Sequence, residues 1–460
     1  MRSLLVADRI WGHDGSRAVL LDGAQIAGIG TPEGLAGSAS EVVRLNGVLV
    51  PGLTDHHIHP NALAAITNSV DLAAADDFAS IIEGFQSSEA VMGTGLDEAR
   101  LAEGRLPTAG DLTGIDRPIL LMRRCGHIAV GNRRTLELAG VHAATPDPPR
   151  GTIDRDETGR PTGVVRESAV SLLTDALQGV APPPSPVQLL ETFGRLLDVG
   201  ITRVHAIAST GSPLWCGSGR EVDSLYSIAE ELPIDVDLIV ATSSVADLRE
   251  VASSLPQGRI RFGGWKGFAD GSLGGRTAAL SESYPDGGTG MITLPENAGE
   301  LARTAVDLGG VAAVHAIGDR AVDAVLDLFA SVGGGPSLRI EHASLVSDGA
   351  LKRMADLGVT ASVQPAFLVS DRQLIADTLT PRLREMAYRF VDMAAAGIDL
   401  RGGSDAPVED PSPWEALDET GLANPLSMYA EPLEVGAGAD LVLRDGDHVT
   451  QVWKDGIAQR

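Results

Sequence analysis

VLVPGLTDHHIHPN, at positions 48–61, is the stretch from which the fold can be predicted. Its apolar start predicts a buried strand that ends at His57 and His59. Alternate residues of a strand point to the same side, so these two imidazoles lie about 7 Å apart along one face. Two imidazoles so placed can bind one metal ion, although a bare His-x-His fits an ordinary pair of surface or core histidines equally well. A metal site therefore requires further ligands at the ends of other strands.

A regular alternation of helices and strands follows Pro186. Seven segments, the last at 382–397, carry apolar residues at the i, i+3 and i+4 spacing of an amphipathic helix, and each precedes an apolar strand. Several of these helices end at a glycine, which is common at helix C-termini. Together with the strand before His57 the chain has eight strands, and strict alternation with helices predicts a parallel sheet. We therefore predict an α/β fold, a (β/α)8 TIM-type barrel, with a doubly wound open sheet as the alternative.

The two ends of the chain predict a second, smaller component. Residues 1–50 and 431–460 carry short apolar or alternating strands separated by Asp-Gly and Asn-Gly turns. We expect both ends to build one small β-sandwich beside a barrel that spans residues 51–430. The irregular mixture of helices, strands and a hairpin at about 61–185 predicts an α+β insertion after the first barrel strand.

The composition favours a globular protein that does not bind nucleic acid. Hydrophobic residues make up 43% of the 460 residues, and the net charge of −26 opposes binding to nucleic acid or to an anionic membrane. Cys125 and Cys216 are too few for a disulfide framework, which indicates a reducing compartment. The N-terminus lacks the apolar core of a signal peptide, and no apolar run approaches the ~18 residues of a spanning helix. A cytoplasmic location is therefore expected.

Residues with ligand chemistry gather where the predicted barrel strands end. In chain order these residues are His57, His59, His205, Lys266, His315, Glu341, His342, Gln364 and Asp405. They include five of the ten histidines of the chain. Because the C-terminal ends of barrel strands meet at one face, we expect a metal site there, built from imidazoles and a carboxylate, with His205 outside the ligand set. Nitrogen and carboxylate donors without cysteine fit zinc or another divalent first-row metal.

The donor types predict hydrolysis by an activated water. A metal held by imidazoles and a carboxylate lowers the pKa of a bound water, and Asp405 can accept its proton as general base. Lys266 is unusual at such a site, because an ammonium ion repels a metal ion. It requires a carboxylate partner such as Asp270, or carbamylation to an anion that bridges two metal ions. The sequence leaves open whether the site holds one ion or two.

Longer motifs around these residues resemble a known family. DHHIH (55–59), His315, His342 and GGSDAP (402–407) resemble the amidohydrolase superfamily of metal-dependent hydrolases. Five further stretches resemble its YtcJ-like branch, which is similar to N-substituted formamide deformylase. They are CGHIAVGNRRTLELAG (125–140), GTIDRDETGRPTGVVRES (151–168), WKGFADGSLGGRTAAL (265–280), VHAIGDRAVDAVLD (314–327) and RIEHASLVSDGALKRMADLGVTASVQPAF (339–367).

The resemblance implies roles for the metal-binding residues. His57 and His59 match ligands of one metal ion, and His315 and His342 match further ligands. His342 is alternatively the group that polarises the substrate carbonyl when a single metal ion is present. Lys266 matches the position of a bridging carbamate, and Asp405 matches the aspartate that acts as ligand and general base.

Other residues are expected to face the substrate. By resemblance, His127 belongs to the insertion, and Asp270 and Arg276 belong to a loop near the pocket. His205 is a further candidate because it lies at a strand end. The chain departs from the branch after Trp414, where the family has a longer helical segment.

The activity that the resemblance implies is hydrolysis of a carbon–nitrogen bond other than a peptide bond, in an amide, formamide or cyclic amide. The alternatives are a heterocycle deaminase of the same superfamily and a catalytically inactive barrel with a binding or regulatory role. The expected partner is a small-molecule substrate, with neither nucleic acid nor membrane. The sequence leaves a homodimer open.

Overall fold

A computed structural model of the chain describes most of the sequence. The described residues are 2–67, 69–123, 128–148, 151–167, 169–178, 184–211, 219–274, 276–285, 287–446 and 448–459. The chain forms two compact units. The first unit comprises Met1–Pro60, Leu189–Ala208 and Leu225–Arg460, and the second comprises Asn61–Gln188 and Ser209–Ser224.

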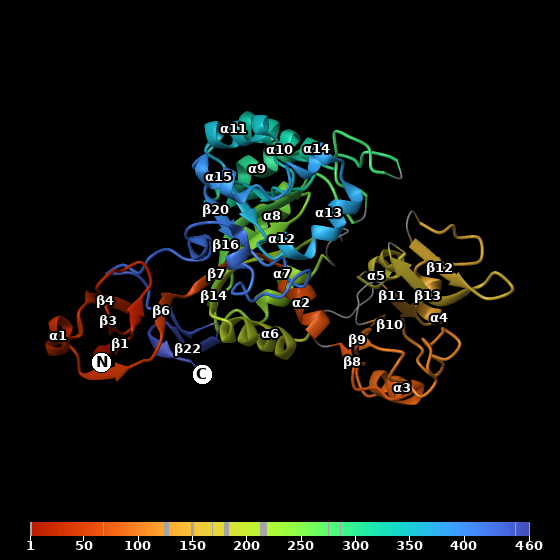
Figure 1. The fold of residues 1–460 in the computed structure, drawn as a ribbon, viewed down its shortest axis with the longest axis horizontal. Coiled ribbons are helices and arrows are strands. Elements are labelled where there is room, and N and C mark those ends of the chain that lie inside the picture. The colour runs from red at the N-terminus through yellow and green to blue at the C-terminus, as the bar shows by residue number, and fades with distance from the viewer. Residues whose placement is uncertain are drawn as a thin grey trace. The chain divides into compact units, whose positions relative to one another are not determined.

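The first unit contains the predicted barrel. Eight strands pair in parallel, each with its neighbour along the chain, in one sheet that is nearly closed (Figure 1). They are β7 (Leu53–Ile58), β14 (Ile201–Ser209), β15 (Asp235–Ala241), β16 (Ile260–Phe268), β17 (Val311–Ala316), β18 (Leu338–His342), β19 (Thr360–Val363) and β20 (Leu400–Gly402). These are the eight strands predicted from the alternation, so the predicted fold class is confirmed and the doubly wound sheet is wrong.

Helices connect the barrel strands, and their apolar faces explain their positions. In α9, for example, Leu301, Ala302 and Ala305 are buried at helical spacing. The helices between β14 and β20 are α7 (Glu221–Tyr226), α8 (Val245–Ser253), α9 (Ala298–Asp307), α10 (Asp319–Val332), α11 (Asp348–Leu357), α12 (Phe367–Ser370), α13 (Arg372–Thr378), α14 (Pro381–Arg384) and α15 (Phe390–Ala395), and α6 (Pro186–Asp198) precedes β14. Within the described residues, none of the helices combines the length and the apolar character needed to cross a membrane.

The prediction of a single helix over 382–397 is wrong. The chain instead forms α14 and α15, which are separated by a turn whose Ala387 makes an isolated β-bridge with Leu345. In that turn Tyr388 has a left-handed φ of 49° and donates its backbone N–H to the Ser344 carbonyl at 2.8 Å. A long-range backbone hydrogen bond therefore replaces the helical bonds that the apolar spacing predicted.

The segment after Trp414 lies along one edge of β7. It contains two 3-10 helices, Leu417–Thr420 and Pro425–Met428, rather than a long α-helix. The backbone N–H of Thr54 in β7 donates to the Tyr429 carbonyl at 2.8 Å. The edge of β7 that β14 does not pair is thus partly covered by this short segment.

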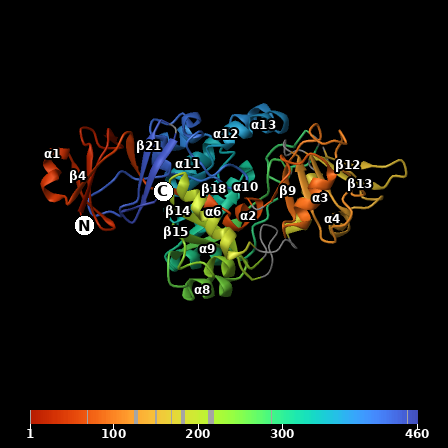
Figure 2. The same cartoon turned by 90° about the horizontal axis from the view of Figure 1, so that it is seen from below.

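Both ends of the chain form a β-sandwich, as the sequence predicted. The N-terminal and C-terminal strands lie side by side in both views (Figures 1 and 2), and Val442 of β21 pairs with Val50 of β6. One sheet has the order β4 (Gln25–Gly30), β3 (Ala18–Asp22), β1 (Arg2–Val6), β5 (Glu41–Arg44), and the other β2 (Arg9–Ile10), β6 (Val48–Pro51), β21 (Leu441–Asp445), β22 (His448–Lys454), β23 (Ile457–Ala458). Leu5, Leu49 and Trp453 belong to one buried cluster, so the two sheets share a core. The short helices α1 (Pro32–Leu35) and η1 (Ala36–Ser38) connect β4 to β5.

The second unit is an α+β structure with its own core. Its six-stranded sheet has the order β12 (Gly151–Arg155), β13 (Pro161–Glu167), β11 (Ile128–Gly131), β10 (Leu120–Arg123), β9 (Met92–Leu96), β8 (Val70–Asp71), and its helices are α2 (Pro60–Thr67), α3 (Phe78–Gln86), α4 (Arg133–Leu138) and α5 (Val170–Gln178). Leu121 packs with Phe85 of α3, whereas the neighbouring Leu120 packs with Leu173 of α5. Because consecutive strand residues point to opposite faces, helices cover both faces of this sheet.

Candidate metal centre

Three donor atoms converge where β7 and β20 end. The Nε2 atoms of His57 and His59 each lie 3.2 Å from Oδ1 of Asp405. These residues form a group among the described residues whose ligand atoms all lie within 4.8 Å of one another. Zinc–ligand bonds of about 2.0–2.1 Å at a tetrahedral angle place two ligands about 3.3 Å apart. The spacing and chemistry of the three donors therefore fit one divalent ion.

Backbone hydrogen bonds hold the two segments together. The N–H of Asp405 donates to the His57 carbonyl at 2.7 Å, and the N–H of His59 donates to the Ala406 carbonyl at 2.9 Å. Asp405 itself has a left-handed φ of 57°, a conformation that aspartate tolerates better than most residues. The backbone of the β20 loop thus fixes the direction of the Asp405 side chain.

A buried carboxylate supports this junction. Asp55 accepts hydrogen bonds from the Ser404 hydroxyl at 2.6 Å, from the Ser404 N–H at 3.1 Å and from the His57 N–H at 3.0 Å. Burial raises the pKa of Asp55 to about 6, although the bonds from Ser404 and His57 oppose the rise. Asp55 therefore connects the start of the His-x-His segment to the loop that carries Asp405.

Gly403 is packed so closely against β7 that any side chain there would disturb the site. A Cβ at this position would lie 2.7 Å from both the backbone N and the Cβ of His57. We expect Gly403→Ala to displace His57 and to weaken metal affinity about tenfold, because overpacking costs about 1–3 kcal/mol. The dissociation constant for Zn²⁺ measures this effect.

Gly37 offers a matched control for this substitution. A Cβ at Gly37 would meet no atom within 4 Å, so Gly37→Ala should leave the zinc affinity unchanged. Equal zinc affinity in Gly403→Ala and the wild type would show that His57 does not depend on this close packing.

Asp405 is held as an anion. Burial alone would raise the pKa of Asp405, but His57 and His59 more than offset this and hold the pKa well below its usual range. An ionised carboxylate beside two imidazoles is a donor set that suits a divalent cation.

The second nitrogen of His57 is also engaged. His57 Nδ1 donates to Glu341 Oε2 in a short hydrogen bond, and Glu341 is fully buried. Arg339 Nε donates to the other oxygen of Glu341 at 2.5 Å. Burial would raise the pKa of Glu341, but Arg339 and His57 hold it well below its usual range. His57 therefore presents Nε2 toward Asp405.

His342 and His315 lie close to this group without belonging to it. The His342 ring centroid lies 4.8 Å from that of His57 and 4.5 Å from that of His315. His342 Nδ1 donates to Gln364 Oε1 at 2.8 Å, which leaves Nε2 for a ligand or substrate. His315 Nε2 donates to the Gly271 carbonyl at 3.0 Å, so a metal-binding role would fall to its Nδ1.

Lys266 and Asp270 are buried beside these histidines. The Nζ of Lys266 lies 5.1 Å from the ring centroid of Phe268, and the side chain is 2% exposed. Asp270 accepts three backbone N–H bonds, from Ala279, Ile317 and Gly318. Burial raises the pKa of Asp270 to about 6 despite these bonds. The carboxylate of Asp270 thereby holds the loop after β16 against the end of β17.

The other predicted substrate contacts have different positions. Arg276 is half-buried in the same loop, with its guanidinium 5.2 Å from the ring centroid of Tyr284. His205 Nδ1 accepts a hydrogen bond from Arg339 at 2.8 Å. His127 lies outside the described residues.

The support that Arg339, Asp55 and Ser404 give to the site was not predicted from the sequence, and Glu341 and Gln364 had no predicted role. Arg339 and Glu341 are two residues apart on β18, a spacing that places both on one face of a strand. This spacing could have predicted that Arg339 and Glu341 point to the same side of β18. It could not predict that Glu341 would bond to His57.

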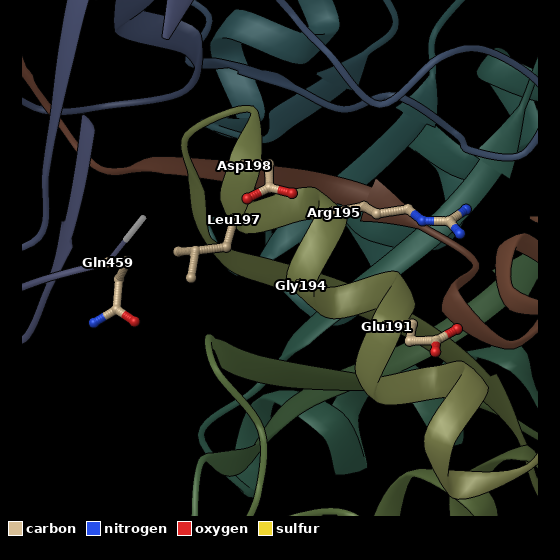
Figure 3. Close-up of a pocket in the computed structure, with 6 residues that line it drawn as sticks. All are labelled: Glu191, Gly194, Arg195, Leu197, Asp198 and Gln459. Atoms are coloured by element: carbon tan, nitrogen blue, oxygen red, sulfur yellow. The ribbon is translucent and has the colours of Figure 1, made fainter. Parts of the chain in front are cut away.

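A shallow depression on the surface is remote from these residues. It has a volume of about 390 Å³ and is lined by Glu191, Gly194, Arg195, Leu197, Asp198 and Gln459 (Figure 3). Most of these residues lie in the C-terminal half of α6, which leads into the start of β14. The candidate metal ligands His57, His59 and Asp405 lie at the opposite ends of the barrel strands.

Comparison with known proteins identifies the family. Residues 45–422 match the profile of the amidohydrolase family. The chain belongs to this family. This amidohydrolase is 30% identical over 424 residues to YtcJ of Bacillus subtilis, covering 87% of this chain and 79% of that protein. It is 29% identical over 456 residues to N-substituted formamide deformylase of Arthrobacter pascens, covering 91% of this chain and 82% of that enzyme.

A solved structure is similar to this amidohydrolase over nearly its whole length. An uncharacterized metal-dependent hydrolase of Pyrococcus furiosus has a TM-score of 0.76 and 26% sequence identity, covering 97% of this chain and 99% of that one. The predicted resemblance to the YtcJ-like branch is confirmed by these relatives. Together with the His57, His59 and Asp405 group, they support a hydrolase that uses a divalent metal ion.

Proposed function

We propose that this amidohydrolase cleaves a non-peptide carbon–nitrogen bond in an amide, formamide or cyclic amide. The observation that carries the proposal is the convergence of His57, His59 and Asp405, with both imidazole Nε2 atoms 3.2 Å from one carboxylate oxygen. The similarity to a relative named N-substituted formamide deformylase supports this substrate class. The proposal keeps the predicted small-molecule substrate and cytoplasmic location.

Three side chains would carry the reaction. His57 and His59 would hold a divalent metal ion, which supplies Lewis acidity and lowers the pKa of a water toward neutrality. Asp405, an anion beside both imidazoles, would accept the proton of the attacking water. It would then donate that proton to the nitrogen of the leaving amine, which departs as a neutral molecule.

His342 would act next to this group. Its Nδ1–H is occupied by Gln364, so the neutral ring presents the lone pair of Nε2. That arrangement favours a metal-binding role for His342 over polarisation of the substrate carbonyl, which requires a donor. His315 would contribute through Nδ1, because its Nε2 is bound to the Gly271 carbonyl.

The metal ion is proposed to be zinc, since nitrogen and carboxylate donors in this number suit it. Whether the site holds one or two ions depends on Lys266, which would bridge two ions as a carbamate. Its burial beside His57, His315 and His342 is compatible with that role.

The substrate side of the site is proposed to include His127 and Arg276, whereas His205, whose Nδ1 accepts from Arg339, would act indirectly. Asp270 would act indirectly, because its carboxylate already accepts three backbone hydrogen bonds and so holds the loop that carries Arg276. Arg276 would therefore affect substrate affinity by direct contact, and Asp270 by fixing the position of the loop.

Removal of the metal tests the proposal. We expect chelation of the full-length protein to abolish hydrolysis of a panel of formamides, linear amides and cyclic amides, and addition of Zn²⁺ or Mn²⁺ to restore it. His57→Ala should lose both the bound metal and the activity. His448→Ala, which changes an exposed histidine of β22, should retain both.

Two outcomes would contradict the proposal. Protein that carries no tightly bound metal and hydrolyses no member of the panel after metal addition would favour an inactive barrel. Release of ammonia from an amino-substituted heterocycle, with no cleavage of any amide, would favour the deaminase alternative.

A further inference from the structure

A buried chain of charged groups leads away from the candidate metal ligand His57. Glu341 is 0% exposed and Arg339 is 3% exposed, so both charges lie in the interior of the barrel. One oxygen of Glu341 accepts from His57 Nδ1, and the other accepts from Arg339 Nε. Buried charges are costly unless they are paired and fully hydrogen-bonded, which calls for an explanation of this pair.

We propose that Glu341 is a positioning residue, which orients His57 for metal binding, and that Arg339 holds Glu341 in place. This inference rests on the proposed function, because it requires a metal ion at His57, His59 and Asp405. It assigns Glu341 a role that acts through His57 and not through direct contact with the metal ion.

The geometry separates Glu341 from the ligands. Its carboxylate binds Nδ1 of His57, whereas Asp405 lies at Nε2 on the far side of the same ring. A carboxylate that accepts the Nδ1–H fixes the tautomer, so that Nε2 keeps the lone pair a metal requires. It also makes Nε2 more basic and prevents rotation of the ring.

Arg339 ties this arrangement to three parts of the barrel. Its guanidinium donates to Glu341 Oε1 at 2.5 Å, to His205 Nδ1 at 2.8 Å and to the His56 carbonyl at 3.1 Å. The His56 carbonyl belongs to the peptide that immediately precedes His57. Arg339 therefore hydrogen-bonds both to the Glu341 carboxylate that orients His57 and to the backbone carbonyl next to His57.

His205 completes the chain on β14. Because its Nδ1 accepts from Arg339, its proton is on Nε2, which lies 3.7 Å from Asp237 Oδ2. Its ring also packs edge-on against that of His56, with centroids 4.7 Å apart. In this arrangement His205 supports the site from within the barrel.

The decisive measurement is metal affinity and not activity. We expect Glu341→Gln to weaken the binding of Zn²⁺ by about 10- to 100-fold, the usual loss when the partner of a metal-ligating histidine is removed. The probe is Zn²⁺ alone, added to the metal-free full-length protein in competition with a chromophoric chelator. Glu341→Asp, which keeps the charge, serves as a second variant and should show a smaller loss of affinity.

A matched control separates positioning from folding. Asp235 is also a carboxylate paired with cations, but it lies at the start of β15, at the opposite end of the strands. Asp235→Asn should lower the unfolding midpoint and leave the zinc affinity within about twofold of the wild type. A loss of affinity in both variants would show that Glu341 acts only through general stability and would overturn the inference.

The remaining outcomes distinguish this inference from the proposed function. Wild-type protein that does not bind Zn²⁺ contradicts the proposed function, and the role of Glu341 with it. Wild-type protein that binds Zn²⁺, together with unchanged affinity in folded Glu341→Gln and Glu341→Asp, overturns the role of Glu341 alone.

Discussion

Replacing Asp405 by asparagine is expected to lower kcat by about 10²- to 10⁴-fold, the usual contribution of a general acid–base group. Asparagine keeps the shape and one oxygen of the side chain, but it can neither accept the proton of the attacking water nor balance the charge of the metal ion. His57 and His59 remain, so part of the metal should be retained. Turnover of the preferred amide and metal content, measured on the same preparation, test both expectations.

Asp410 provides the control for this substitution. It is an exposed carboxylate five residues further along the same loop, and its Oδ1 accepts the Ser412 N–H at 2.8 Å. Asp410→Asn keeps that acceptor and should retain normal turnover. Near-normal turnover in Asp405→Asn would remove Asp405 as the base, and complete loss of metal would assign it chiefly a ligand role.

The barrel could be predicted because its signal is local. Each helix shows its apolar spacing and each strand its apolar run, and parallel pairing follows from their alternation without knowledge of any long-range contact. The His57 and His59 pair could be predicted for the same reason, since alternation along one strand fixes their common side.

The remaining features depend on contacts between distant segments. The left-handed conformation of Asp405 accompanies hydrogen bonds between its loop and β7, and no pattern near Asp405 encodes them. The partner of Glu341 depends on how β18 faces β7 across the barrel. Similarly, the helix expected over 382–397 breaks where Tyr388 pairs with Ser344. The spacing of apolar residues does not show whether a distant carbonyl will replace the hydrogen bonds inside a helix.

Lys454→Met is expected to lower the free energy of unfolding by about 3 kcal/mol, at the low end of the 3–5 kcal/mol for breaking a buried ion pair. Lys454 is 3% exposed, and its Nζ lies 2.8 Å from Asp235 Oδ2 and 2.6 Å from Asp440 Oδ2. It therefore joins the C-terminal strand β22 to the first residue of β15. Methionine would fill the volume but remove the ammonium group that Asp440 Oδ2 accepts from.

The low end of the range is expected because Asp235 keeps two other partners. Arg203 and Arg259 still lie 3.0 and 3.3 Å from its carboxylate oxygens. Chemical denaturation of the full chain measures the loss. Lys352→Met is the control, since that lysine is paired with Asp356 on the exposed face of α11 and should cost at most about 0.5 kcal/mol. Equal losses in the two lysine variants would mean that burial adds nothing to the contribution of the Lys454 ion pairs.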